Sequence, residues 1–173
     1  MFLNNSILGH RRDLLPFRGN WLFIPSVMTI EVRNFNELGT QELYDILQLR
    51  SEVFVVEQNC VYQDLDGKDT LAVHILGIKN GKLVAYTRIF TPEVLYKEAS
   101  IGRVIVRKKE RKFGYGKEIM EASIKVILDS YGNVPIRISA QTYLLKFYNS
   151  LGFVQQGKEY LEDGIPHILM IKK

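Results

Sequence analysis

Hydrophobic and polar positions follow one another with a period that changes several times after residue 28. Residues 29–35 alternate between apolar and charged side chains, the two-residue period of a strand. After Thr40, which we expect to cap a helix, the apolar residues recur at helical spacing and are Leu43, Ile46, Leu47, Val53 and Phe54. The first unit is therefore predicted as a strand followed by an amphipathic helix.

The middle of the chain predicts a hairpin, a third strand and a long helix. Residues 73–78 and 82–90 are rich in β-formers, and Asn80-Gly81 between them supplies the positive φ of a tight turn. A β-branched run at residues 101–106 precedes a helix that we expect to begin near Tyr115. One face of that helix carries Met120, Ile124, Ile127 and Leu128.

The last third continues the alternation of strands and helices. We expect a strand at residues 136–140, then a short helix capped by Thr142 and ended by Gly152. Two final strands, residues 153–160 and 165–171, are joined through Glu162-Asp163-Gly164. This order predicts one mixed α/β domain.

Composition and charge narrow the class of protein and its possible partners. The chain has 173 residues, of which 46% are hydrophobic and 24% charged, as in an ordinary globular domain. No run is long enough to cross a membrane, and a net charge of +4 does not favour nucleic acid as the default partner. The single Cys60 excludes an internal disulfide, and we expect a cytoplasmic protein without a metal site.

The first 27 residues differ from the rest. They hold His10-Arg11-Arg12 and then a short apolar run that Pro25 interrupts, a weak likeness to a signal peptide. Strand-like alternation begins directly after Met28. We therefore expect residues 1–27 to be an N-terminal extension and residues 28–173 to be the folded domain.

The segment richest in chemistry lies between the third strand and the long helix. Arg111 to Lys117 form a basic loop in which Gly114 and Gly116 let the backbone approach a ligand. The unpaired N–H groups and the positive dipole of a helix N-terminus bind phosphate groups. The Rossmann pattern lacks its third glycine, and the P-loop pattern fails at Glu118. An ordinary strand-to-helix turn remains the alternative.

Two motifs carry a resemblance to a known family. Arg-x-x-Gly-x-Gly at residues 111–116 resembles the coenzyme A signature of the GNAT superfamily, and residues 147–153, about 35 positions later, resemble its second motif. Residues 49–60, 62–67 and 162–168 look closest to the ElaA-like branch. The resemblance covers residues 29–173 and implies a mixed, mostly antiparallel central sheet flanked by helices.

The resemblance also implies an activity and its residues. The enzyme would move an acetyl group from acetyl-CoA to a primary amine of a small molecule or peptide, by direct attack through a tetrahedral intermediate. Val104, Ile105 and Val106 would line the pantetheine arm, and the pyrophosphate would be held by Arg111, Lys112, Phe113, Gly114, Tyr115, Gly116 and Lys117. Tyr148 would protonate the leaving thiolate, although its place on an apolar helical stripe also fits core packing.

A base is needed when the acceptor is a lysine-like amine, because its deprotonation at pH 7 costs about 4.6 kcal/mol. Glu57 is the first candidate, since the family forms its acceptor cleft after the first helix. The other candidates are Asp64, Asp66, His74 and His167. His74, within an apolar strand, more often has a packing role.

Two other functions stay open from the sequence. A GNAT-fold enzyme with a different acyl donor, such as an acyl-homoserine lactone synthase, also carries an Arg and a Phe like Arg50 and Phe54. A non-catalytic module could bind coenzyme A or nucleic acid through the basic residues between positions 103 and 117. A homodimer is a further expectation, since many members of the family pair through edge strands or final hairpins.

Overall fold

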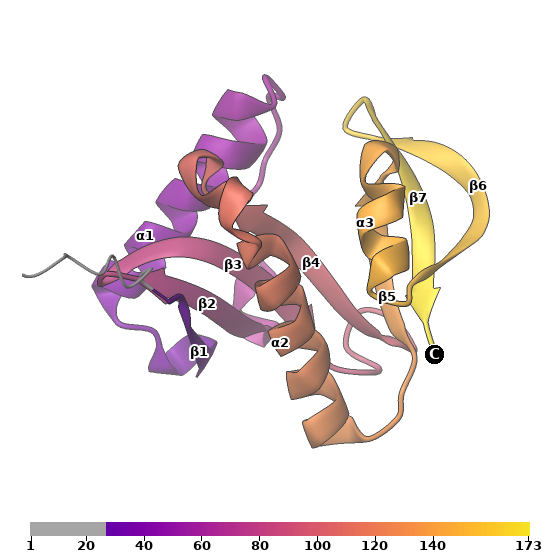
Figure 1. Ribbon diagram of the computed structural model, residues 1–173, viewed down its shortest axis with the longest axis horizontal. Helices are drawn as coiled ribbons and strands as arrows, with labels where there is room; N and C mark the ends of the chain where they lie inside the picture. Colours follow the sequence, from indigo (N-terminus) through magenta and orange to yellow (C-terminus); the bar gives the residue numbers. More distant parts are fainter. Residues whose placement is uncertain (1–26) are drawn as a thin grey trace, which may run out of the picture.

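The structure is a computed structural model that describes residues 27–173 (Figure 1). In that part of the chain, seven strands form one sheet in the order β1-β2-β3-β4-β5-β7-β6, and only β4 and β5 pair in parallel. The strands are β1 (Thr29–Asn34), β2 (Val73–Lys79), β3 (Lys82–Phe90), β4 (Ala99–Val106), β5 (Ile136–Gln141), β6 (Val154–Glu162) and β7 (Ile165–Lys172). The predicted mixed, mostly antiparallel sheet is confirmed. The predicted extension lies outside the described residues except for Val27.

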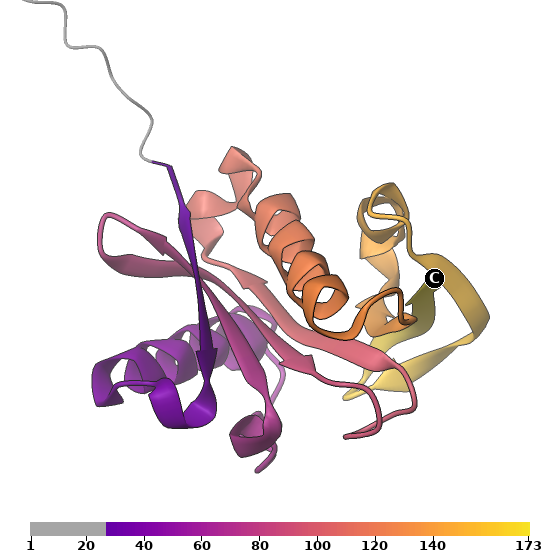
Figure 2. The ribbon, with the colours of Figure 1, turned by 90° about the horizontal axis from the view of Figure 1, so that it is seen from below.

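Helices cover both faces of this sheet (Figure 2). α1 (Thr40–Arg50) packs on one face, where Leu49 meets Leu76 and Ile105 in a buried cluster. α2 (Tyr115–Tyr131) and α3 (Leu145–Ser150) contribute to the larger core on the other face. The helical faces predicted from apolar spacing are therefore the buried ones.

Two predicted helix caps are wrong. Gly39, not Thr40, is the N-cap of α1, and the Glu42 carboxylate accepts a hydrogen bond from the Gly39 N–H at 2.8 Å. Thr142 is the first residue of a 3-10 turn, Thr142–Leu144 (η5), that leads into α3. Sequence pattern places helix ends only to within a residue or two, because several neighbours can satisfy the free N–H groups.

α1 does not continue as a regular helix. Residues Ser51–Glu57 form a π-helical segment (η2), which is wider than an α-helix and shifts the direction of the side chains that follow. Val53 stays buried, and with Phe54 and Glu57 it lines a cleft between β4 and β5. The apolar spacing alone predicted an unbroken helix here.

Close packing between β2 and β3 leaves no space for a side chain at Gly77. The register between these strands shifts next to Gly77. A Cβ on Gly77 would lie 2.6 Å from the Met28 sulfur and 2.9 Å from the Ala85 Cβ, which is attached directly to the backbone and cannot rotate away. This position therefore requires glycine for space.

We expect Gly77→Ala to lower the free energy of unfolding by about 1–3 kcal/mol, because the added methyl overpacks the sheet. Urea unfolding followed by circular dichroism measures this. Gly102→Ala is the matched control, since a Cβ there meets no atom within 4 Å. Equal effects of the two substitutions would contradict the packing explanation.

Candidate active site

A cleft opens where two neighbouring strands diverge. β4 and β5 pair only at Ala99 with Ile136 and at Ser100 with Arg137. Beyond these pairs the strands separate, and a cleft of about 1150 Å³ lies between them. Since the pairing stops at Ser100, the later backbone groups on this edge of β4 can bind an extended ligand as another strand would.

The other edge of β4 carries a bulge. Its register with β3 shifts between Tyr86 and Arg88, and Arg103 opposite this shift has a φ of 51°. Such a conformation is unfavourable for a side chain with a Cβ and is often found near functional sites. It directs Arg103 toward Asp64, where Nε lies 2.7 Å from Oδ1 as an ion pair without hydrogen-bond alignment.

Buried arginines hold the loop before β2 against the sheet. Arg50, fully buried at the end of α1, donates to Asp64 Oδ2 at 2.8 Å and to Asp69 Oδ1 at 2.7 Å. Arg88 donates to both oxygens of Asp66 and to Asp69 Oδ1. With Arg103 these residues make a balanced ionic cluster of three cations and three anions.

The charge state of this cluster is fixed by its pairing. Burial by itself would raise the pKa of Asp66, but hydrogen bonding and attraction from Arg88 outweigh it and hold the pKa well below its usual range. The pKa of Asp69 is lowered in the same way, with Arg50 as a further partner. Both carboxylates therefore stay ionised and are weak bases.

His74 belongs to the same buried region and not to the cleft. Its ring is fully buried, Nε2–H donates to the Asp69 carbonyl at 3.0 Å, and Nδ1 accepts from the Tyr86 hydroxyl at 2.8 Å. Burial lowers the pKa of His74; the contact with Asp69 acts in the opposite direction, but with Arg50 and Arg88 nearby the net shift of the pKa is downward. The imidazole is thus neutral and has a packing role, as its position in an apolar strand suggested.

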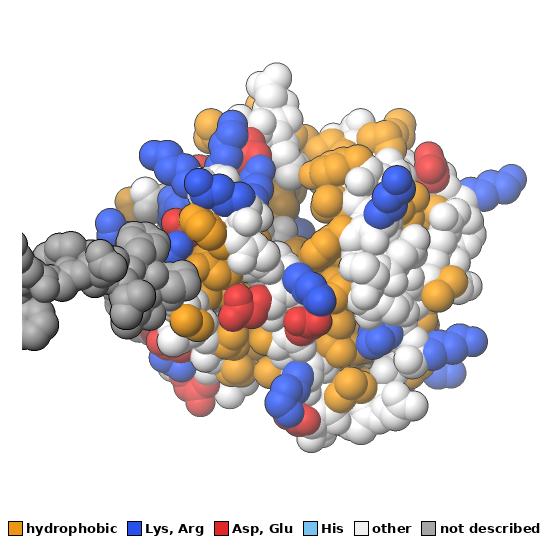
Figure 3. All heavy atoms as spheres, in the orientation of Figure 1, with side chains coloured by type: hydrophobic (Ala, Val, Ile, Leu, Met, Phe, Trp, Pro, Cys, Tyr) orange, Lys and Arg blue, Asp and Glu red, His pale blue; other side chains and the backbone are white. Residues whose placement is uncertain are grey.

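The basic loop lies at one end of the cleft. It forms a 3-10 segment, Lys108–Phe113 (η4), and Gly114 with a φ of 82° turns the chain into α2. Figure 3 shows Lys and Arg side chains gathered over this loop, beside a hollow that separates it from α3. The N-terminus of α2 therefore faces a region of positive charge, as an anion site requires.

Arg111 connects this loop to the segment after α1. Its Nη1 and Nη2 donate to the two carboxylate oxygens of Glu57 at 2.5 and 3.0 Å, and its Nε donates to the Val106 carbonyl at 3.0 Å. The hydrogen bond from Arg111, together with its positive charge, lowers the pKa of Glu57. Both side chains line the cleft.

Tyr148 lines the cleft from α3. The residue is 5% exposed, and its ring makes edge contacts with Phe147 and Phe153 at centroid distances of 5.0 and 6.2 Å. Its hydroxyl has no hydrogen-bond partner among residues 27–173. Burial raises the pKa of Tyr148, so the phenol is neutral at pH 7 and can donate a proton.

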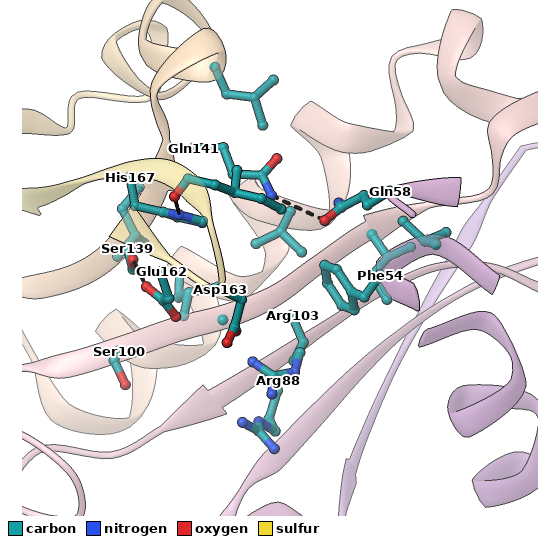
Figure 4. A pocket seen from close by; sticks show the side chains of 18 of the residues that line it. Phe54, Gln58, Arg88, Ser100, Arg103, Ser139, Gln141, Glu162, Asp163 and His167 are labelled. Carbon is teal, nitrogen blue, oxygen red and sulfur yellow. Dashed lines mark hydrogen bonds between the residues drawn. The ribbon is translucent and has the colours of Figure 1, made fainter. Parts of the chain in front are cut away.

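The turn between β6 and β7 also borders the cleft, which Glu162 and Asp163 line (Figure 4). Gln141 Nε2 donates to Gln58 Oε1 at 3.3 Å, and the Cys60 thiol donates to the Asp163 carbonyl at 3.4 Å. These two contacts span the cleft from the segment after η2 to β5 and the hairpin. His167 donates from Nδ1 to the Ile165 carbonyl at 2.8 Å, which leaves Nε2 as the basic nitrogen.

Comparison with known proteins assigns this architecture to a family. Residues 36–173 match the model of the acetyltransferase (GNAT) domain. The chain belongs to the GNAT superfamily. Within it the chain lies in the ElaA-like branch: Escherichia coli ElaA is 44% identical over 140 residues, which are 80% of this chain and 92% of ElaA.

Solved structures agree with this assignment. The crystal structure of Escherichia coli ElaA matches with a TM-score of 0.80 at 40% identity, covering 85% of this chain and all of that one. An acyl-CoA N-acyltransferase from Pseudomonas aeruginosa matches with a TM-score of 0.80 at 37% identity, covering 84% and 99%. This GNAT chain therefore has the fold of acyl-CoA N-acyltransferases.

An acyl-homoserine lactone synthase has the same fold. LasI matches with a TM-score of 0.71, covering 84% of this chain and 89% of LasI, but is only 17% identical. That likeness shows the fold alone, and a fold does not identify an acyl donor.

The structure brings together part of the site residues suggested by the GNAT resemblance. The cleft is lined by Glu57, Val104, Ile105, Val106, Arg111, Gly116 and Tyr148, and also by the base candidates Asp66 and His167. The loop residues Lys112, Phe113, Gly114, Tyr115 and Lys117 are not among its lining residues. Tyr115 is buried in the main core, Phe113 lies beneath Lys79 Nζ at 4.2 Å from the ring centroid, and Lys117 pairs with Glu121.

Other residues were missed by sequence reasoning. Arg88 lines the cleft and was not named from the sequence. Arg50, which is fully buried, was named only for its likeness to an arginine of acyl-homoserine lactone synthases. Their partners lie 14 to 22 residues away in the chain, so no local motif marks the pairs. A signal was present in the spacing of Asp64, Asp66 and Asp69, three acids within a short loop.

Of the helices in the described part of the chain, none is long and apolar enough to cross a membrane.

We expect Asp64→Ala to lower the free energy of unfolding by about 3–5 kcal/mol, because it leaves the buried Arg50 without its main partner. Chemical denaturation at pH 7 measures this. Asp129→Ala removes an ion pair of 2.7 Å, close to the 2.8 Å between Arg50 and Asp64 but between exposed side chains, and should cost less than about 1 kcal/mol. A small loss for Asp64→Ala would mean that the cluster does not hold the loop.

Proposed function

We propose that this GNAT enzyme transfers an acetyl group from acetyl-CoA to a primary amine of a small molecule or peptide. The observation that carries the proposal is the convergence of an open β4 edge, a basic helix N-terminus and Tyr148 on one cleft. Each of these supplies a different requirement of the reaction.

The donor would lie along the open edge of β4. Backbone groups of Val104, Ile105 and Val106 would pair with the amides of the pantetheine arm, and one backbone N–H of this strand would polarise the thioester carbonyl. Arg111 and Gly116 would face the pyrophosphate from the cleft. Lys112, Phe113, Gly114, Tyr115 and Lys117 would act through their backbone or through charge at the loop surface.

Tyr148 is proposed as the general acid. The amine attacks the thioester carbonyl directly, and the tetrahedral intermediate then expels a thiolate. A neutral phenol at the cleft can protonate that thiolate as it leaves. The apolar surroundings that raise the Tyr148 pKa also keep the proton on the phenol until it is needed.

Glu57 is proposed as the group that takes the proton from the amine. Asp64 and His74 do not line the cleft, and Asp66 is held ionised by Arg88 with a pKa well below its usual range. This leaves Glu57 on the η2 side and His167 on the hairpin side. The pKa of Glu57 is also lowered by an arginine, but Glu57 is preferred because its partner Arg111 has a side chain 43% exposed, whereas Arg88, which holds Asp66, is buried.

Two less specific features support a cytoplasmic location and a homodimer. A single cysteine suits the reducing cytoplasm, where disulfides are rare. β6 is an exposed edge strand with an entirely exposed burial pattern, so two copies could pair there as a homodimer.

We expect acetyl-CoA at about 100 times its dissociation constant to stabilise the protein by about 2.7 kcal/mol, or roughly 5–10 °C in melting temperature. A thermal melt with acetyl-CoA, ATP or NAD at equal concentrations measures this. A shift with ATP alone, or with none of the three, would contradict the proposed donor.

We expect Tyr148→Phe to reduce kcat by about 10²–10⁴-fold while coenzyme A binds as before, because only the proton donor is removed. Release of the free thiol during amine acetylation reports kcat, and calorimetry reports binding. Tyr143→Phe is the control, since Tyr143 also lines the cleft but is 74% exposed. Unchanged kcat in Tyr148→Phe would assign this tyrosine to packing only.

A further inference from the structure

One ion pair joins the proposed donor site to the proposed base. Arg111 lies in η4, just before the N-terminus of α2, whereas Glu57 ends η2, and 54 residues separate them in the chain. Their side chains meet through two hydrogen bonds, at 2.5 and 3.0 Å. The same guanidinium that would face a pyrophosphate is therefore occupied by a carboxylate of the enzyme.

Three of the five N–H groups of Arg111 are already used within the protein, including the pair that forms its terminal fork. Its Nε–H is used by the Val106 carbonyl, which fixes the plane of the guanidinium at the end of β4. The two terminal nitrogens then present the planar fork that matches either a carboxylate or a phosphate. A phosphate group can take both of these positions only when Glu57 gives them up.

The exchange is energetically feasible because the pair is partly solvated. The side chains of Arg111 and Glu57 are 43% and 27% exposed, and ion pairs with such exposure contribute little stability. A pyrophosphate carries more negative charge than one carboxylate and is also attracted by the α2 N-terminus. Once the donor is bound, Arg111 is therefore expected to pair with its pyrophosphate in place of Glu57.

We propose that donor binding and base release are coupled, because the pyrophosphate of the acyl-CoA takes Arg111 from Glu57 and frees this carboxylate for the acceptor amine. The coupling rests on the proposed function and assigns Arg111 a second role, as a positioning residue for Glu57. Without donor, Glu57 is paired and a poor base, so an amine that arrives first meets no active base.

The charges around Glu57 are consistent with this coupling. Its pKa is lowered first by the hydrogen bond to Arg111 and then by the charges of Arg111 and Lys108, the cations that act on it most. Loss of the Arg111 contact, with phosphate charge nearby, moves the pKa back upward and makes Glu57 a stronger base.

The chain offers a matched control pair. Glu52 and Arg107 form an ion pair at 2.7 Å between the same two segments of the chain, with side chains 45% and 34% exposed. Neither residue lines the cleft. Glu52→Gln therefore removes the same charge from the same segment without touching the proposed exchange.

Calorimetric titration with coenzyme A tests the coupling. Glu57→Gln should tighten the dissociation constant about two- to fivefold, because Arg111 is no longer held, whereas Glu52→Gln should change it less than about twofold. In an Arg111→Gln background the gain from Glu57→Gln should vanish, as a double-mutant cycle requires of a direct interaction. An equal gain from both glutamate variants, no gain at all, or a gain that persists without Arg111 would overturn the proposal.

A second measurement separates this proposal from the proposed function. The carboxyl carbon of Glu57, titrated by NMR, should show a higher pKa with coenzyme A bound than without it. Coenzyme A that binds without moving this pKa would overturn the coupling and leave the donor site intact. Failure of coenzyme A to bind the unmodified protein would overturn both proposals.

Discussion

The parallel pairing of β4 with β5 covers only two residue pairs, and the remaining architecture of the site depends on where it stops. Had the strands stayed paired to Val106, their backbone groups would be satisfied by each other and no cleft would form. Their divergence exposes an edge of β4 in the middle of a sheet. It also places α3, with Tyr148, across from η2, with Glu57, so that groups from distant segments face the same space.

A split sheet requires other contacts to hold its two parts in place. On the β4 side, the ionic cluster of Arg50, Arg88 and Arg103 fixes the loop that contains Asp64, Asp66 and Asp69. The charges balance, and each buried carboxylate has a cation within ion-pair distance, so burial does not leave a lone charge. The strained φ of Arg103 is tolerated because this cluster holds its side chain.

Charged side chains of both signs line the cleft. Arg111 lines it from the loop before α2, and Glu162 and Asp163 line it from the hairpin, near Arg88 and Arg103 (Figure 4). At the loop, Arg111 and Glu57 neutralise one another. In the proposed reaction, the cations of the loop would attract the phosphate groups of the donor.

The sequence by itself determined the order of strands and helices, the Asn80-Gly81 hairpin, the glycine-bearing loop before α2 and the family resemblance. These features are local, because periodicity and turn chemistry act over a few residues. Only the tertiary structure decided that Gly39 replaces Thr40 as cap, that η2 widens into a π-helix, that Tyr115 enters the core and that Arg111 holds Glu57. Such outcomes depend on which side chains meet after folding, and contacts between residues as far apart as 57 and 111 leave no pattern in the chain that joins them.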